Sequence, residues 1–89
     1  MEAMKEVAII INEVYVPTAR RKTLETERVD GLAEDILENG QKDPILVRKA
    51  EDRKDNARYV LVEGLHRLEA CRELGEETIA ALIVHARRR

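Results

Sequence analysis

The 89 residues suffice for one domain with a modest core and exclude a second domain. The composition is 44% hydrophobic with two tyrosines and no Phe or Trp, so the core must be aliphatic. The 38% of charged residues balance to a net charge of −2, which argues against a broad electropositive face and confines any anion site to a local patch.

The N-terminal third is predicted to hold β-structure followed by an amphipathic helix. The β-branched run 7–11 indicates a buried strand, and residues 14–16 indicate its continuation or the second half of a bent pair, ending at Pro17. After a polar stretch, Thr26 is expected to cap a helix that ends at Asn39-Gly40. The apolar positions of this helix follow helical spacing: Val29, Leu32, Ala33, Ile36 and Leu37.

The rest of the chain is predicted to add a hairpin, a helix and a strand. Residues 45–48 and 59–62 indicate two strands joined by a charged loop with a turn at Asp55-Asn56. A helix beginning near Leu65 and ending at Gly75 follows, and residues 78–84 indicate a last strand. This order predicts a single α+β domain over residues 1–89, a small mixed sheet with two main helices packed on it.

The start of the second helix is the strongest candidate site. The passage through Glu63-Gly64 into this helix leaves several backbone N–H groups without partners, and glycine allows a ligand to approach closely. His66 and Arg67 lie in the first turn, where the helix dipole disfavours a cation by about 0.3–1 kcal/mol. A bound phosphate would explain both residues. The alternatives are a surface pair of Arg67 with Glu63 or Glu69, and a structurally hydrogen-bonded His66.

Other features bound the function further. The basic runs Arg20-Arg21-Lys22 and Arg87-Arg88-Arg89 are candidates for DNA or additional phosphate contacts, or they are solvated surface. The single cysteine, Cys71, lies on the predicted buried face of its helix, so we expect a core residue, no intrachain disulfide and no structural metal. The longest apolar run is too short to span a membrane and a signal peptide is not evident, so we expect a cytoplasmic protein.

The stretch 61–70, with Gly64, His66, Arg67 and Ala70, resembles the G-x-[HR]-R-x-x-A motif of the ParB/sulfiredoxin superfamily, which includes the "ParB-like nuclease" domain. The upstream helix followed by Gly40 and Pro44, in the spacing G-x-x-x-P, and the final strand 77–84 agree with that family. The resemblance covers about residues 13–84. Because the chain ends at Arg89, it implies a free-standing module without the helix-turn-helix domain of partition proteins.

The resemblance implies nucleotide binding at the start of the second helix. Gly64, Leu65, His66 and Arg67 match the phosphate-binding motif, and Arg28 occupies the place of a phosphate-contacting lysine in sulfiredoxins. Two hydroxyl residues of the sulfiredoxins are replaced here, by Gly31 and Asp35. Asp35 would either hold a magnesium ion carried by the nucleotide or weaken nucleotide binding. Leu65 stands where sulfiredoxins carry the nucleophilic cysteine, which excludes sulfiredoxin chemistry.

The favoured hypothesis is a module that binds the phosphates of CTP or ATP, a slow NTPase or switch linked to DNA partition or processing. Glu63 is the candidate general base if catalysis occurs. The alternatives are a small-molecule kinase, a DNA-binding or nuclease module, and a non-catalytic adaptor with a vestigial anion site. The partners expected are a nucleotide, DNA or a DNA-binding protein, and a second copy of the chain paired through an exposed sheet edge, but no membrane.

Overall fold

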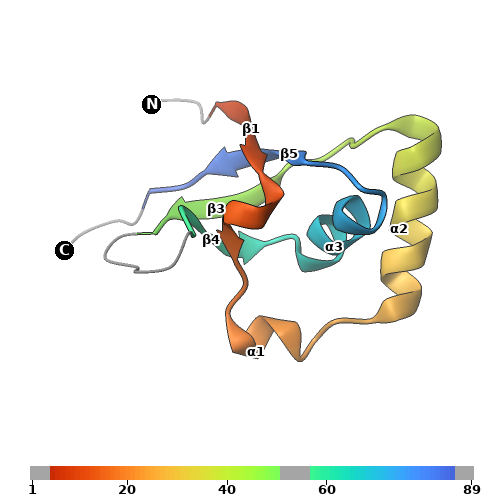
Figure 1. The fold of residues 1–89 in the computed structure, drawn as a ribbon, viewed down its shortest axis with the longest axis horizontal. Coiled ribbons are helices and arrows are strands. Elements are labelled where there is room, and N and C mark those ends of the chain that lie inside the picture. The colour runs from red at the N-terminus through yellow and green to blue at the C-terminus, as the bar shows by residue number, and fades with distance from the viewer. Residues whose placement is uncertain (1–4, 51–56, 86–89) are drawn as a thin grey trace.

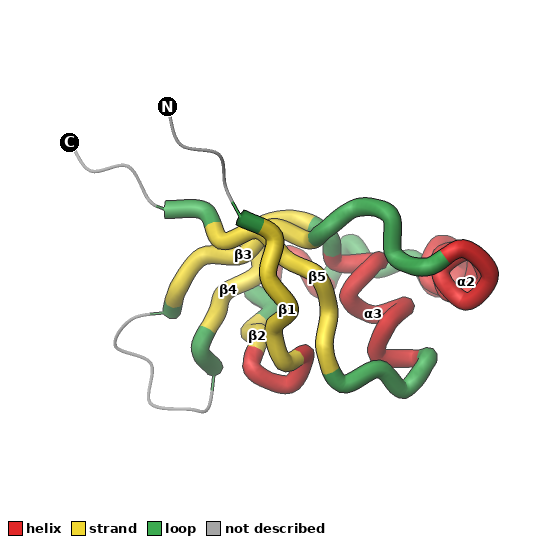
Figure 2. Tube along the Cα trace, turned by 90° about the horizontal axis from the view of Figure 1, so that it is seen from above, coloured by secondary structure: helices red, strands yellow, loops and turns green. Residues whose placement is uncertain are grey.

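The computed structural model describes residues 5–50 and 57–85. The turn predicted at Asp55-Asn56 and the basic run 87–89 lie outside these ranges. Within them, five strands form one mixed sheet (Figures 1 and 2). In spatial order the strands are β1 (Glu6–Ile10), β5 (Thr78–Ile83), β3 (Ile45–Lys49), β4 (Tyr59–Glu63) and β2 (Val14–Tyr15).

The sheet alternates antiparallel and parallel pairs. β1 runs antiparallel to β5 and β3 antiparallel to β4, whereas β3 is parallel to β5 and β2 is parallel to β4. The predicted hairpin 45–48 and 59–62 corresponds to the β3–β4 pair. Each parallel pair places strand ends of the same polarity side by side, and the carboxyl end of β4 leads directly into a helix.

The N-terminal β-segment is a pair of strands, and they lie on opposite edges of the sheet. A single 3-10 turn, η1 (Ile11–Glu13), joins them. Since a step from Ile10 to Val14 spans at most about 14 Å, the two edges of the sheet must approach each other, and the sheet is strongly curled. Ile11, 2% exposed, fills the inside of this curl. Dimerisation through an exposed sheet edge stays a prediction.

The helices form two further layers. Helix α3 (Leu65–Glu73) packs against the sheet, and helix α2 (Thr26–Asn39) packs against the outer side of α3 (Figures 1 and 2). The main core joins the sheet to Leu65, Leu68 and Cys71 of α3. A smaller core lies between the helices, where the small side chains of Ala33 and Ala70 allow close approach. The α+β class predicted from the sequence is therefore confirmed.

Three local features differ from what the sequence indicated. Thr26 does not cap α2: the N-cap residue is Glu25, whose backbone amide is held by a side chain of α3. A short helix that was not predicted, α1 (Thr18–Arg21), precedes α2, and the carbonyl of Pro17 accepts the amides of Arg20 and Arg21 at its start. Leu37 is 74% exposed, because the buried face of α2 turns away from it toward α3.

Candidate functional site

An open pocket of about 670 Å³ lies at the start of α3, between the turn that follows β4, the first half of α2 and the segment that precedes α2. It contains the motif predicted from the sequence together with residues more than thirty positions upstream. Its lining residues are Arg20, Thr23, Arg28, Gly31, Leu32, Asp35, Glu63, Gly64, Leu65, His66 and Arg67.

Gly64 makes the sharp turn from β4 into α3. Its φ is +111°, a left-handed conformation that side-chain-bearing residues rarely adopt. A Cβ at this position would lie 2.7 Å from Cγ2 of Ile45 and 3.3 Å from its Cα. Position 64 therefore needs glycine both for its backbone angle and for its contact with β3.

The first turn of α3 offers backbone donors to the pocket. By helix geometry, the amides of residues 65–67 have no carbonyl acceptor within the helix, and the dipole adds a partial positive charge there. Leu65 is 6% exposed, so its side chain belongs to the core and it offers the site only its N–H. This arrangement favours an anion over a neutral ligand.

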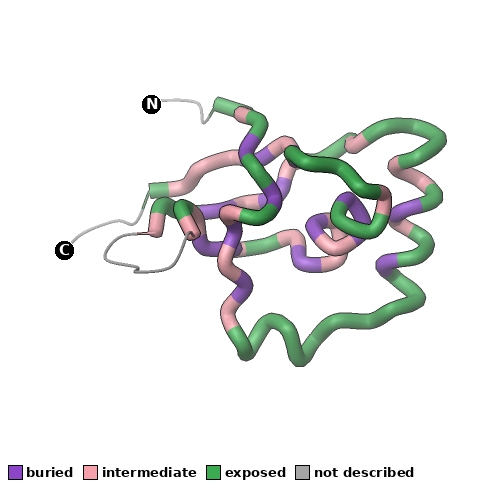
Figure 3. The backbone as a smooth tube through the Cα atoms, viewed as in Figure 1, coloured by how far each residue is buried: buried purple, intermediate pink, exposed green. Residues whose placement is uncertain are grey.

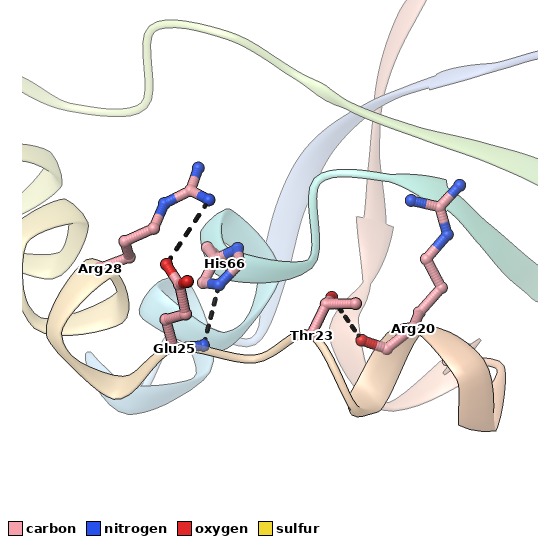
Figure 4. Close-up of polar contacts among 5 residues, drawn as sticks. All are labelled: Arg20, Thr23, Glu25, Arg28 and His66. Carbon is pink, nitrogen blue, oxygen red and sulfur yellow. Dashed lines mark hydrogen bonds and ion pairs between the residues drawn. The ribbon is translucent and has the colours of Figure 1, made fainter.

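Three guanidinium groups reach the pocket from three elements. Figure 4 shows Arg20 and Arg28 on either side of the start of α3, with both side chains extending in the same direction. Arg67, from α3 itself, lies 3.7 Å from Asp43 Oδ2, whose side chain is 75% exposed. Arg28 lies 3.9 Å from the carboxylate of Glu25, and both side chains are about two-thirds exposed. The Arg28 pair is exposed on both sides and worth under about 1 kcal/mol, and the Arg67 side chain is 24% exposed but its partner Asp43 is open to solvent at 3.7 Å, so an anion can displace both carboxylates.

The ion pair that Arg67 forms differs from the two pairs considered from the sequence. Its partner is Asp43, in the loop before β3, rather than Glu63 or Glu69. Glu69 pairs instead with Arg72 at 3.5 Å, one turn further along α3. Asp43 was not identified from the sequence, where its only signal was its position immediately before Pro44.

His66 makes a structural hydrogen bond at the edge of the pocket. The backbone N–H of Glu25 donates to its Nε2 at 3.0 Å (Figure 4). A ring nitrogen that accepts a hydrogen bond carries no proton, so Nε2 is unprotonated in this arrangement. His66 is thus structurally hydrogen-bonded, one of the alternatives considered from the sequence, and it also lines the pocket.

Two carboxylates belong to the pocket wall. Asp35, on α2, is partly buried and accepts a hydrogen bond from Asn39 Nδ2 at 2.9 Å. Glu63 is the exposed last residue of β4. Across residues 5–50 and 57–85, no group of three or more His, Cys, Asp or Glu side chains could hold a metal ion. Any metal at this site would need further ligands from a bound molecule.

The three residues of the basic run 20–22 lie in different surroundings in the structure. Arg20 faces the pocket, whereas Arg21 donates from Nε to the Val16 carbonyl at 3.1 Å and lines a separate hollow of about 360 Å³. Lys22 is exposed and lines neither of these hollows. Thr23 lines the pocket and donates its hydroxyl to the Arg20 carbonyl at 2.7 Å. Nothing in the sequence distinguished Thr23 from its polar neighbours.

Cys71 is buried in the core, at 2% exposure, as predicted. Burial raises the pKa of its thiol above the ordinary value of 9.0, Glu76 raises it further, and Arg67 partly opposes the shift. This thiol is therefore protonated near neutral pH and lies apart from the pocket lining. Within the described residues, the helices are too short and too polar to cross a membrane.

Comparisons with known proteins agree with this geometry. The family model of the ParB N-terminal domain matches residues 2–89. Sulfiredoxin from Arabidopsis thaliana is 26% identical, with a TM-score of 0.77 over 92% of this chain and 86% of that one. A C-terminally truncated chromosome-partitioning protein ParB from Caulobacter crescentus, complexed with CTP-gamma-S, is also 26% identical, with a TM-score of 0.77.

The match to this ParB covers 93% of the present chain, which thus spans only 46% of the length of that ParB chain. A free serine kinase in complex with AMP shares the fold alone, at 19% identity and a TM-score of 0.72, over 93% of this chain and 32% of that one. No curated protein matches the sequence.

Proposed function

The chain belongs to the ParB N-terminal domain family, and from this premise we propose that it is a nucleotide-binding module. The ligand is CTP or ATP, and its phosphates lie at the start of α3. The observation that carries the proposal is the convergence of Arg20, Arg28 and Arg67 on the pocket that contains the Gly64 turn. The similar structures that hold CTP-gamma-S and AMP support the same class of ligand.

Each part of the pocket has a role in this proposal. One phosphate accepts from the amides that follow Gly64 and from the guanidinium of Arg67, whose planar donors suit two oxygens at once. Arg20 and Arg28 neutralise the neighbouring phosphates from the other two elements. The lining has three guanidinium groups and two carboxylates, a formal balance of +1 with His66 neutral, which is smaller than the charge of a triphosphate.

Magnesium carried by the nucleotide would reduce this difference in charge. Carboxylates together with phosphate oxygens and water form an ordinary magnesium shell, and Asp35 would supply the carboxylate here. The ion would arrive with the nucleotide, because the described residues of the pocket form no group of three or more ligands that could hold it alone. Glu63, adjacent to the turn, is assigned as the general base of a slow hydrolysis, which makes the module an NTPase switch linked to DNA partition or processing.

The test is a titration with CTP, ATP and GTP, with and without magnesium, followed through backbone amide shifts by NMR. We expect one nucleotide to perturb residues 63–68. Arg67→Ala should weaken its binding about 10- to 100-fold, the size of one charged hydrogen bond. Arg58→Ala is the matched control, because Arg58 is an exposed arginine, 75% accessible and outside the pocket.

The absence of shifts at residues 63–68 at millimolar nucleotide would refute the proposal. Titration with double-stranded DNA at two salt concentrations then decides the main alternative. Shifts at residues 20–22 that weaken steeply with salt would indicate a DNA-binding or nuclease module. No response to either ligand would leave the non-catalytic adaptor.

A further inference from the structure

One wall of the pocket is a segment with very little attachment to the rest of the fold. Every residue from Thr18 to Arg28 is exposed, as Figure 3 shows for the stretch that joins α1 to α2. Arg20 and Thr23 of this segment line the pocket, and Arg28 follows in the first turn of α2, which Val29 packs against α3. The position of this wall therefore depends on whatever contacts hold the segment against α3.

A single long-range polar contact does so within the described residues. The Glu25 amide donates to Nε2 of His66, which is 41 positions away along the chain. The remaining polar contacts of the segment are local, from Arg21 to Val16, from Thr23 to Arg20 and from Arg28 to Glu25. His66 thus joins the segment before α2 to α3, the helix whose N-terminus is the proposed anion site.

We propose that His66 is a positioning residue of the pocket and that its Nε2 is not a phosphate ligand. It acts by accepting the Glu25 N–H and thereby holding the segment that carries Arg20 and Thr23 beside the start of α3, next to Arg28 of α2. The consequence for affinity rests on the proposed nucleotide binding, whereas the hydrogen bond itself does not.

The chemistry of the imidazole supports this role. A neutral imidazole has one acceptor and one donor nitrogen, but an imidazolium has two donors and no acceptor. The bond to Glu25 therefore requires a neutral ring with its proton on Nδ1, so His66 adds no positive charge to the pocket. This agrees with its place in the first turn of α3, where the dipole disfavours a cation.

Without the Glu25–His66 hydrogen bond, the segment before α2 would become ordered only when a ligand binds. That ordering costs conformational entropy and lowers the affinity. We therefore expect a variant without an acceptor at position 66 to bind nucleotide about 3- to 10-fold more weakly, the size of one net hydrogen bond. A side chain that restores the acceptor should restore the affinity.

The first measurement uses the ligand-free protein. Long-range proton–nitrogen correlation spectra at mildly alkaline pH report which ring nitrogen carries the proton. The variant His85→Gln removes the only other histidine, which is exposed near the C-terminus, so the remaining ring signal is that of His66. We expect the Nδ1–H tautomer; a ring protonated on Nε2 would overturn the proposal whether or not nucleotide binds.

The second measurement compares His66→Gln with His66→Lys. Glutamine offers an acceptor oxygen without charge, whereas lysine offers charge without an acceptor. We expect His66→Gln to keep both the hydrogen-exchange protection of the Glu25 amide and the affinity for ATP or CTP, and His66→Lys to lose both. If lysine keeps the affinity and glutamine loses it, His66 is a phosphate ligand and the proposal is wrong.

Discussion

Replacement of Gly64 by alanine is the most direct test of how the turn is built. A left-handed backbone costs a side-chain-bearing residue about 1–2 kcal/mol. The new Cβ would also lie 2.7 Å from Cγ2 of Ile45, which is 1% exposed and cannot move away without disturbing the core. Overpacking of this kind typically costs about 1–3 kcal/mol, so we expect Gly64→Ala to lower the free energy of unfolding by about 2–5 kcal/mol.

Two other glycines provide matched controls. Gly75 has a φ of +81° but open space where a Cβ would lie, so Gly75→Ala should cost only the backbone part, about 1–2 kcal/mol. Gly31 lies within α2 and also faces open space, so Gly31→Ala should stabilise the protein by about 0.5–1 kcal/mol. The series separates backbone strain from the contact with Ile45.

Urea unfolding followed by far-UV circular dichroism measures these differences, and Gly64→Ala should lower the midpoint by at least about 1 M. The same substitution in an Ile45→Ala background, which removes Cγ2 but leaves the Cβ of residue 45 at 3.0 Å, should cost less than in the unmodified protein and more than Gly75→Ala. If Gly64→Ala costs no more than Gly75→Ala, or costs the same in both backgrounds, the steric argument is refuted.

Three further outcomes follow from the pocket and the core. Asp43→Asn frees Arg67 from its ion pair with the exposed Asp43 at 3.7 Å and should raise nucleotide affinity about two- to fivefold by calorimetry; an unchanged affinity would mean that the pair does not compete with phosphate. Asp35→Asn should strengthen magnesium-free binding by roughly 1 kcal/mol and reduce the benefit of magnesium, and equal affinities with and without the ion in the unmodified protein would contradict its assigned role. The raised pKa of Cys71 means that the unfolded chain loses this proton first, so the free energy of unfolding should fall as pH rises above about 9, by up to about 1.4 kcal/mol per pH unit. Urea titrations across this range should show a shallower decline in Cys71→Ala; parallel declines would refute the assignment.

Features encoded by neighbouring residues were predictable. The spacing of apolar residues along α2 and the glycine after Asn39 give the helix and its end, since both depend on contacts within a turn or two. The candidate site was also local at its centre, because a glycine between a strand and a helix implies a tight turn with free amides. Leu37 and Thr26 mark the limit of such reasoning. A helical pattern does not say which neighbouring element packs on the helix, and so it predicts neither the exposed Leu37 nor the cap at Glu25.

The other half of the pocket could not be derived from local patterns. Arg20 enters it and Arg21 turns away, although the two are adjacent in a uniformly polar stretch. Asp43 reaches Arg67 only because the loop before β3 passes the start of α3. These outcomes depend on where separate elements pack, and exposed charged side chains carry almost no signal about that.

The amino-acid sequence thus determined the two main helices, most of the strands and the glycine turn at Gly64. The tertiary structure decided that β1 and β2 occupy opposite edges, that the segment before α2 forms a wall of the pocket, and that His66 holds that wall through Glu25. The physical reason is the separation along the sequence over which each interaction acts. Helical periodicity and backbone angles act between residues a few positions apart, whereas the assembly of the pocket depends on a hydrogen bond that spans 41 positions and forms only when the core has brought α2 and α3 together.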